Sequence, residues 1–194
     1  MFRLPLVAAL IGLACSVPAM AQEPQDYLGV PGPISLGGED YVLSWSSNPQ
    51  PGYYKQEYLP QGSTPEMYDS MVIVEFLVSD MALTDVVAAQ MNMINQRKAT
   101  DPIANMAVFD NQERGELLLD FILSAKDDAG EYILEWNGYR YAEAELDGQD
   151  GSLLFAVSER SYGNDNAEAF MRDLREFKAK RSLDLTSADL PQLR

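Results

Sequence analysis

Aromatic side chains gather around a proline-rich segment in the first third of the chain. Trp45 precedes the segment 48–52 (Asn-Pro-Gln-Pro-Gly), and Tyr53, Tyr54 and Tyr58 follow it. Rings that carry a polar group suit sugars, peptides or protein partners, because they bury a large area at a low cost in conformational entropy. The segment therefore predicts a recognition surface. The alternative is an ordinary hairpin that packs one aromatic face on the core, since Tyr and Trp are common in strands.

A second candidate site lies on the segment 131–141, where polar side chains alternate with Trp136 and Arg140. Together with Arg160 further along the chain, Arg140 can clamp a ligand carboxylate in a groove, since arginine binds a carboxylate through two hydrogen bonds. The alternative is an outer face on which Glu and Arg pair across strands, each pair worth under about 1 kcal/mol. The predicted binding residues are thus Trp45, Tyr53, Tyr54, Tyr58, Trp136, Arg140 and Arg160.

Acidic residues suggest two further chemistries. The turns that contain Asp127-Asp128 and Asp147 are rich in oxygen, as calcium sites are, but neither has the D-x-[DN]-x-[DN]-G spacing, and turn formation accounts for their aspartates. A glycoside hydrolase needs two carboxyl groups about 5–9.5 Å apart with well-separated pKa values. Among 30 acidic residues some pair will meet that distance by chance. The candidates are Glu57, Glu75, Glu135 and Asp120.

The composition excludes many mechanisms. The 194 residues include no His and a single Cys, Cys15, so imidazole triads, Cys–His pairs and typical zinc, copper and haem sites lack their residues. With 14 Lys and Arg against 30 Asp and Glu, the formal net charge of −16 argues against nucleic acid and anionic lipid as partners. We expect no catalytic residue, no metal ion and no cofactor.

The first 21 residues have the features of a secretory signal. Arg3 gives a positive start, residues 4–14 are mostly apolar, and small residues lead up to Ala21. The apolar run is too short to span a bilayer, which needs about 20 residues. We therefore expect an exported, periplasmic protein that is cleaved after Ala21 and has no membrane span. The alternative is a lipoprotein attached through Cys15.

The remaining chain divides by composition into three parts. Residues 22–38 are rich in Pro and Gly and predict an extended lead-in rather than a packed element. Residues 39–181 have the patterning of a single domain, whose length suits one hydrophobic core. Residues 182–194 are polar, contain a proline and predict a frayed tail.

Hydrophobic periodicity predicts about six strands and two main helices in the domain. The helices are expected over 84–98 and 164–181, where apolar residues recur at helical spacing. The segment 71–78 has the composition of a buried strand, although its apolar spacing also fits a helix. Besides this segment, six strands are expected over 41–46, 53–59, 106–109, 116–126, 131–141 and 152–162, and the turn-forming residues 47–52 predict a six-residue loop between the first two.

Neighbouring strands joined by short turns must be antiparallel. The sequence thus predicts an α+β fold, a single domain in which two main helices pack on a meander-rich antiparallel sheet of about six strands. For function it predicts a non-catalytic module that binds a periplasmic protein or a small amphipathic ligand. Two alternatives stay open: a carboxylate-based hydrolase of envelope glycan, and an acidic inhibitor or immunity-type protein that binds a basic enzyme.

Overall fold

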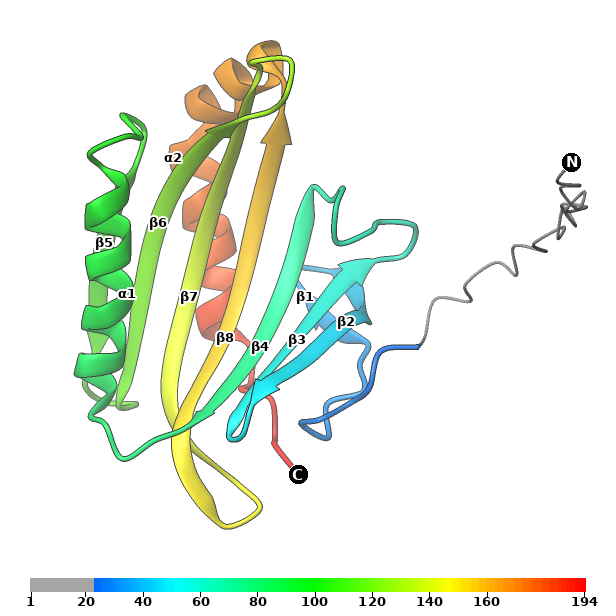
Figure 1. Cartoon of the computed structure of the whole chain (residues 1–194), viewed down its shortest axis with the longest axis vertical. Helices are drawn as coiled ribbons and strands as arrows, with labels where there is room; N and C mark the ends of the chain where they lie inside the picture. Colours follow the sequence, from blue (N-terminus) through cyan, green and yellow to red (C-terminus); the bar gives the residue numbers. More distant parts are fainter. Residues whose placement is uncertain (1–22) are drawn as a thin grey trace, which may run out of the picture.

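One curled antiparallel sheet runs through the part of the chain that this computed structural model describes, residues 23–194 (Figure 1). Its eight strands are β1 (Ile34–Leu36), β2 (Glu39–Gln50), β3 (Tyr53–Pro60), β4 (Ser70–Val78), β5 (Asn105–Asn111), β6 (Glu116–Lys126), β7 (Tyr132–Leu146) and β8 (Gln149–Tyr162). They lie in the order β1-β2-β3-β4-β8-β7-β6-β5. Two four-strand meanders therefore join where β4 pairs with β8.

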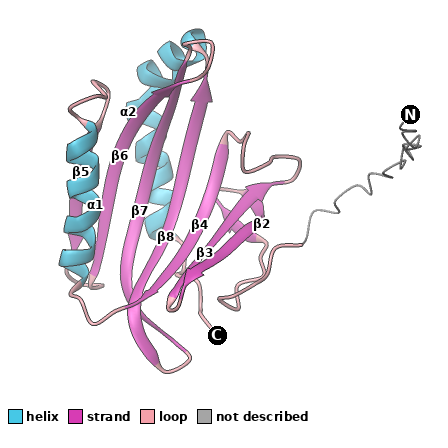
Figure 2. Ribbon diagram, in the orientation of Figure 1, coloured by secondary structure: helices cyan, strands magenta, loops and turns pink. Residues whose placement is uncertain are grey.

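Two helices cover the sheet, one on each face. α1 (Leu83–Arg97) connects the two meanders and packs on β5, β6 and β7, whereas α2 (Asn164–Ser187) follows β8 and packs on β7 and β8. Figure 2 shows α1 in front of the sheet and α2 behind it. Because both faces are covered, the middle of β8 is buried on both sides, and residues 151–158 form an unbroken buried run.

Each face of the sheet has its own apolar core. On the α2 face, Trp136 and Phe155 pack with Leu185 of the helix. On the α1 face, Leu119 packs in one cluster with Ile94 of that helix. Burying one side chain of this size contributes about 1.5–3 kcal/mol, so apolar burial helps to hold both helices on the sheet.

The prediction of about six strands is wrong, because the sheet has eight, although the molecule remains a single α+β domain with two helices. The segment 71–78 lies within strand β4 and is not a helix. The strand that no pattern indicated is β1, whose three residues lie within the Pro/Gly-rich lead-in. It pairs with β2 through a two-residue Gly37-Gly38 turn, in which both φ angles are positive, as such tight turns require.

The N-terminal segment also differs from the extended lead-in that was predicted. Leu28 is fully buried, and the side-chain oxygen of Gln56 accepts hydrogen bonds from the backbone amides of Tyr27 (2.6 Å) and Leu28 (3.0 Å). The Tyr58 hydroxyl donates to the backbone carbonyl of Val30 at 2.6 Å. These bonds satisfy backbone groups that a buried loop would otherwise leave unpaired, so the segment packs as part of the domain.

The C-terminal residues are not a frayed tail. α2 continues past the predicted end at residue 181 to Ser187, and its Leu185 is fully buried. The last residue, Arg194, donates its backbone amide to the carbonyl of Leu28 at 3.0 Å. The described ends of the chain therefore lie against each other.

The predicted signal sequence and Cys15 lie outside the described residues. Within residues 23–194, neither helix is long and apolar enough to cross a membrane.

Candidate functional site

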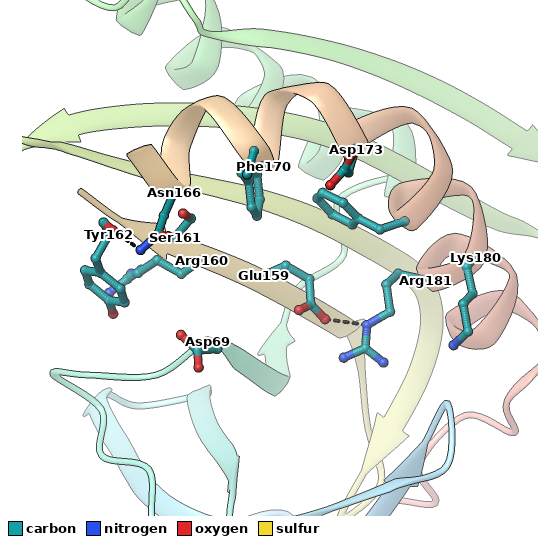
Figure 3. Close-up of a pocket in the computed structure, with 12 residues that line it drawn as sticks. Asp69, Glu159, Arg160, Ser161, Tyr162, Asn166, Phe170, Asp173, Lys180 and Arg181 are labelled. Atoms are coloured by element: carbon teal, nitrogen blue, oxygen red, sulfur yellow. Dashed lines mark hydrogen bonds and ion pairs between the residues drawn. The ribbon is translucent and has the colours of Figure 1, made fainter. Parts of the chain in front are cut away.

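A groove opens where the second meander extends beyond the first. β8 pairs with β4 only as far as Glu159, and past that point the backbone amide of Arg160 donates to the carbonyl of Asp69 at 2.8 Å. The N-terminal half of α2 lies over this free end of β8, which leaves a cavity of about 660 Å³ between the helix, the strand and the loop before β4 (Figure 3). We refer to this cavity as the groove.

The lining of the groove is amphipathic. Phe170 and Phe177 lie two turns apart on α2, and the ring of Phe170 points into the cavity (Figure 3). The two rings pack on each other with centroids 4.7 Å apart, and Phe177 also meets Trp136 of the sheet edge-on. The lining also includes three acidic and three basic side chains. They are Asp69, Glu159 and Asp173, and Arg160, Lys180 and Arg181.

The floor of the groove is a hydrogen-bonded network of polar groups, most of them buried or half-buried. The guanidinium of Arg181 is bound to Glu159, and it also donates to the hydroxyls of Tyr41 (2.7 Å) and Ser70 (2.8 Å). The Ser70 hydroxyl donates to Glu159 at 3.0 Å, and the Tyr41 hydroxyl donates to Glu39 at 2.9 Å. The network joins α2, β8, β4 and β2, so it holds the helix at a fixed position on the sheet.

Burial sets the electrostatics of this network. It raises the pKa of Glu159 above its ordinary value, and the charge of Arg181 with the hydrogen bonds from Arg181 and Ser70 only partly offsets that effect. Burial likewise raises the pKa of the Tyr41 hydroxyl, against the opposing effects of Ser70 and Arg181. The polar groups of the floor therefore bond to one another. A charged ligand has to pair with the other charged side chains of the groove.

Arg160 is the one predicted binding residue that lines the groove. Its guanidinium donates to Glu135, directly opposite on β7, at 2.6 Å. It also stacks on the ring of Tyr68, 4.1 Å from the centroid. This is the cross-strand Glu–Arg pair that the sequence allowed as an alternative, placed at the rim of a groove.

The aromatic hairpin exists, but its rings are divided between the two faces of the sheet. Strand β2 continues to Gln50, and strand β3 begins at Tyr53. The turn is therefore only Pro51-Gly52 and not the whole predicted loop 47–52. Successive strand residues point to opposite faces. Tyr53 therefore lies on the α1 face, where its hydroxyl donates to Glu75 at 2.9 Å, and Tyr54 packs in the α2-face core.

The two other hairpin aromatics also differ in exposure. Tyr58 is fully buried and holds the N-terminal segment, whereas Trp45 is 41% exposed beside residues 23–25. The structure thus does not bring the hairpin rings together as one surface. A recognition role for the exposed Trp45 stays a prediction.

Trp136 and Arg140 lie inside the molecule, between the sheet and α2. Trp136 is fully buried, and its ring nitrogen donates to Asp120 at 2.8 Å. Arg140 is 2% exposed, grips Glu116 through two hydrogen bonds of 3.0 and 2.7 Å, and donates to the carbonyls of Leu185 and Ala188 at the end of α2. The carboxylate that Arg140 clamps belongs to the protein itself.

The acidic candidates have structural partners as well. Within residues 23–194, no group of three or more acidic side chains is arranged to hold a metal ion. Asp127 accepts hydrogen bonds from the amides of its own turn. The four carboxylates considered for hydrolysis all lie in ion pairs: Glu57 and Glu75 with Lys55, Glu135 with Arg160, and Asp120 with Lys178.

Sequence reasoning missed most of the groove. Phe170 and Phe177 were recognisable only as members of the apolar stripe of α2, and Glu159 with Arg181 as ordinary surface charges. The lengths of the predicted elements gave no signal either. The helix predicted over 164–181 would span about 27 Å at 1.5 Å per residue, less than the about 30 Å of the nine-residue β4, whereas the observed 24-residue helix spans about 36 Å and reaches beyond that strand.

Comparison with known proteins gives a family and no close relative. Neither the curated proteins nor the solved structures gave a match to the chain. A protein-family model matches residues 28–190, a range that includes every strand, both helices and the whole lining of the groove. The chain therefore belongs to this family.

Proposed function

We propose that this protein is a non-catalytic binding module whose groove takes a small amphipathic ligand. The observation that supports the proposal is the lining, in which two phenylalanine rings stand beside three acids and three bases. A volume of about 660 Å³ lies within the usual range of small-molecule sites, roughly 300–1,000 Å³. The rings would bury the apolar body of the ligand, and the balanced charges favour a head group that carries both signs.

The charged groups at the rim can change partners at low cost. Lys180 pairs with Asp184 at 3.0 Å and Asp173 with Arg172 at 3.8 Å, and both Lys180 and Asp173 are mostly exposed. Exposed pairs of this kind contribute only about 0–1 kcal/mol, so a ligand head group can replace them. The Arg181 network below them stays in place and keeps the groove open.

Decylphosphocholine below its micelle concentration is a suitable probe, because it joins an apolar chain to a zwitterionic head. We expect it to shift the NMR signals of α2 residues around Phe170, and we expect Phe170→Ser to weaken binding at least tenfold, since about 1.5–3 kcal/mol of ring burial is lost. Met171→Ser is the matched control, because Met171 is the next residue of α2 and does not line the groove. Equal binding by the two variants, or none by the natural chain, contradicts the proposal.

One observation favours the hydrolase as a second candidate. Glu159 is a groove carboxyl with a raised pKa, and Asp69 and Asp173 lie in the same cavity. A general acid of a glycosidase has this property, although Glu159 is already bound by Arg181 and Ser70. Release of reducing ends from envelope glycan by the natural chain, abolished in Glu159→Gln, would establish the hydrolase instead of the binding module.

We also propose that the chain is exported and cleaved after Ala21. The support is the arrangement of Arg3, the apolar run 4–14 and the small residues before Ala21. Mass spectrometry of the protein purified from envelope fractions should show Gln22 as the first residue. A lipid-modified Cys15 at the N-terminus would establish the lipoprotein alternative.

A further inference from the structure

A second cavity, of about 370 Å³, lies on the opposite face of the sheet, under α1. Its sheet side carries three tyrosines from β3 and β7, and its helix side is formed by Val86, Ala89, Gln90 and Met93. We refer to it as the tyrosine pocket. The other lining residues are Tyr53, Glu75, Leu77, Tyr139, Tyr141, Ser152 and Leu154.

Two hydroxyls of the tyrosine pocket, those of Tyr139 and Tyr141, have no hydrogen-bond partner among the described residues. Tyr141 is only 5% exposed, and burial followed by the charge of Glu75 raises the pKa of its hydroxyl. Tyr139 is half-buried, and burial followed by the charge of Glu75 raises the pKa of its hydroxyl as well. Because both side chains line the pocket and neither hydroxyl is paired within the described chain, a ligand that enters the pocket can donate hydrogen bonds to them.

The charge of the tyrosine pocket is negative. Glu75 is its only charged lining residue, and none of the residues that line it in the described chain is Lys or Arg. The nearby cation, Lys55, is shared between Glu57 at 3.0 Å and Glu75 at 3.5 Å. One Lys against two Glu leaves this cluster with a net charge of −1, so an additional cation is attracted and an anion is repelled.

We propose that the tyrosine pocket binds an organic cation, a primary ammonium group on a short alkyl chain. The ammonium donates to the Glu75 carboxylate and to the hydroxyls of Tyr139 and Tyr141, and the electron-rich tyrosine faces favour a cation. The alkyl chain lies against Val86 and Met93 of α1 and Leu154 of β8, which bury it. The net charge of −16 adds a long-range attraction for cations.

The test compares three ligands of one shape, hexylammonium, hexanol and hexanoate, by calorimetry and NMR on the full mature chain. We expect hexylammonium to bind at least tenfold more tightly than hexanol, hexanoate not to bind, and the NMR shifts to map to Tyr139, Tyr141 and α1. Added salt should weaken hexylammonium binding and leave hexanol unchanged. Hexanol that binds as tightly as hexylammonium overturns the proposal.

Three variants locate the site. Glu75→Gln should weaken hexylammonium binding at least tenfold, whereas Asp173→Asn, the same loss of charge in the groove on the other face, should leave it unchanged. Met93→Trp offers a test that spares the buried polar groups, because Met93 is 56% exposed at the mouth of the pocket, and the larger ring should block entry. Full binding by a folded Met93→Trp or Glu75→Gln protein rules out this site.

The tyrosine pocket and the groove are independent, because the sheet separates them. Glu75→Gln should not alter decylphosphocholine binding, and Phe170→Ser should not alter hexylammonium binding. Loss of binding in the tyrosine pocket can therefore be distinguished from loss of binding in the groove.

Discussion

The two helices cover the same sheet by different means. α2 is tied to it by charged groups: Arg140 binds two of its last carbonyls, and its own Lys178 and Arg181 bind Asp120 and Glu159 of the sheet. α1 has fewer such ties: its buried residues are Leu83, Val87 and Ile94, and only its last residue, Arg97, donates to the sheet, to the carbonyl of Ser124 at 2.7 Å.

This difference affects how precisely each helix is placed. Buried charged groups require a partner at hydrogen-bonding distance, so a shift of α2 along the sheet would leave several of them unpaired. Apolar contacts are not directional, and a helix held by them tolerates small shifts. We infer that the groove beside α2 is preformed, whereas the tyrosine pocket under α1 adapts to its occupant.

The strongest test of this difference is to remove Arg140, the cation of β7 that binds the end of α2. Arg140→Ala should lower the free energy of unfolding by about 3–5 kcal/mol, because it leaves the carboxylate of Glu116 buried without its partner. Urea denaturation measures the change. The double variant Arg140→Met/Glu116→Leu should recover most of the loss, since an apolar pair replaces the ion pair. A loss below 1 kcal/mol in the single variant would show that Arg140 does not hold the end of α2 on the sheet.

On the α1 side the corresponding polar anchor is Asp101, just after the helix. Its carboxylate accepts two hydrogen bonds of 2.6 Å from Ser124 of β6 and one of 3.0 Å from the amide of Ile103. Asp101→Asn should cost about 1.5–3 kcal/mol in urea denaturation at neutral pH, because the new amide group cannot accept these bonds as a carboxylate does. Asp128→Asn, the same change in an exposed turn, should cost almost nothing.

The effect of Asp101 should also depend on pH. Burial by itself raises the pKa of Asp101, but the hydrogen bonds from Ser124 and Ile103 and the charge of Arg97 outweigh it and lower the pKa below 3.8. A lowered pKa in the folded state adds stability that is present above the unfolded value of 3.8 and is lost as the pH falls through the folded value. The difference between the natural chain and Asp101→Asn should therefore shrink in acid. A constant difference would assign the cost to packing instead.

Local patterns in the sequence predict the elements of this fold better than their number or arrangement. β6 has the predicted bounds, 116–126, and α1 is shifted by one residue, because alternation and helical spacing are local properties. The chain between Ser47 and Gln50 was assigned to a loop because of its turn-forming residues. It is strand instead, since a bulge between Ser47 and Gln50 accommodates them and the turn needs only two residues.

The candidate sites depend on contacts that no local pattern carries. Strand alternation alone would have separated Tyr53 from Tyr54 and warned against a single aromatic surface. The pairing of Glu159 with Arg181 depends on how α2 lies on β8, and burial of Arg140 depends on a helix covering the second face of the sheet. From sequence alone, a polar residue on a strand is assigned to the surface. Only the packing of α2 shows that Arg140 is buried.

The smallest effects sharpen the comparison most directly, because they separate stability from binding. Met93 on α1 and Met171 on α2 are both exposed, at 56% and 42%, and each replacement by Ala should change the free energy of unfolding by less than about 0.5 kcal/mol. Met93 lines the tyrosine pocket and Met171 lines neither cavity. Met93→Ala should therefore weaken hexylammonium binding severalfold, as alkyl contact is lost, while Met171→Ala leaves it intact. If both variants bind equally, Met93 takes no part in recognition.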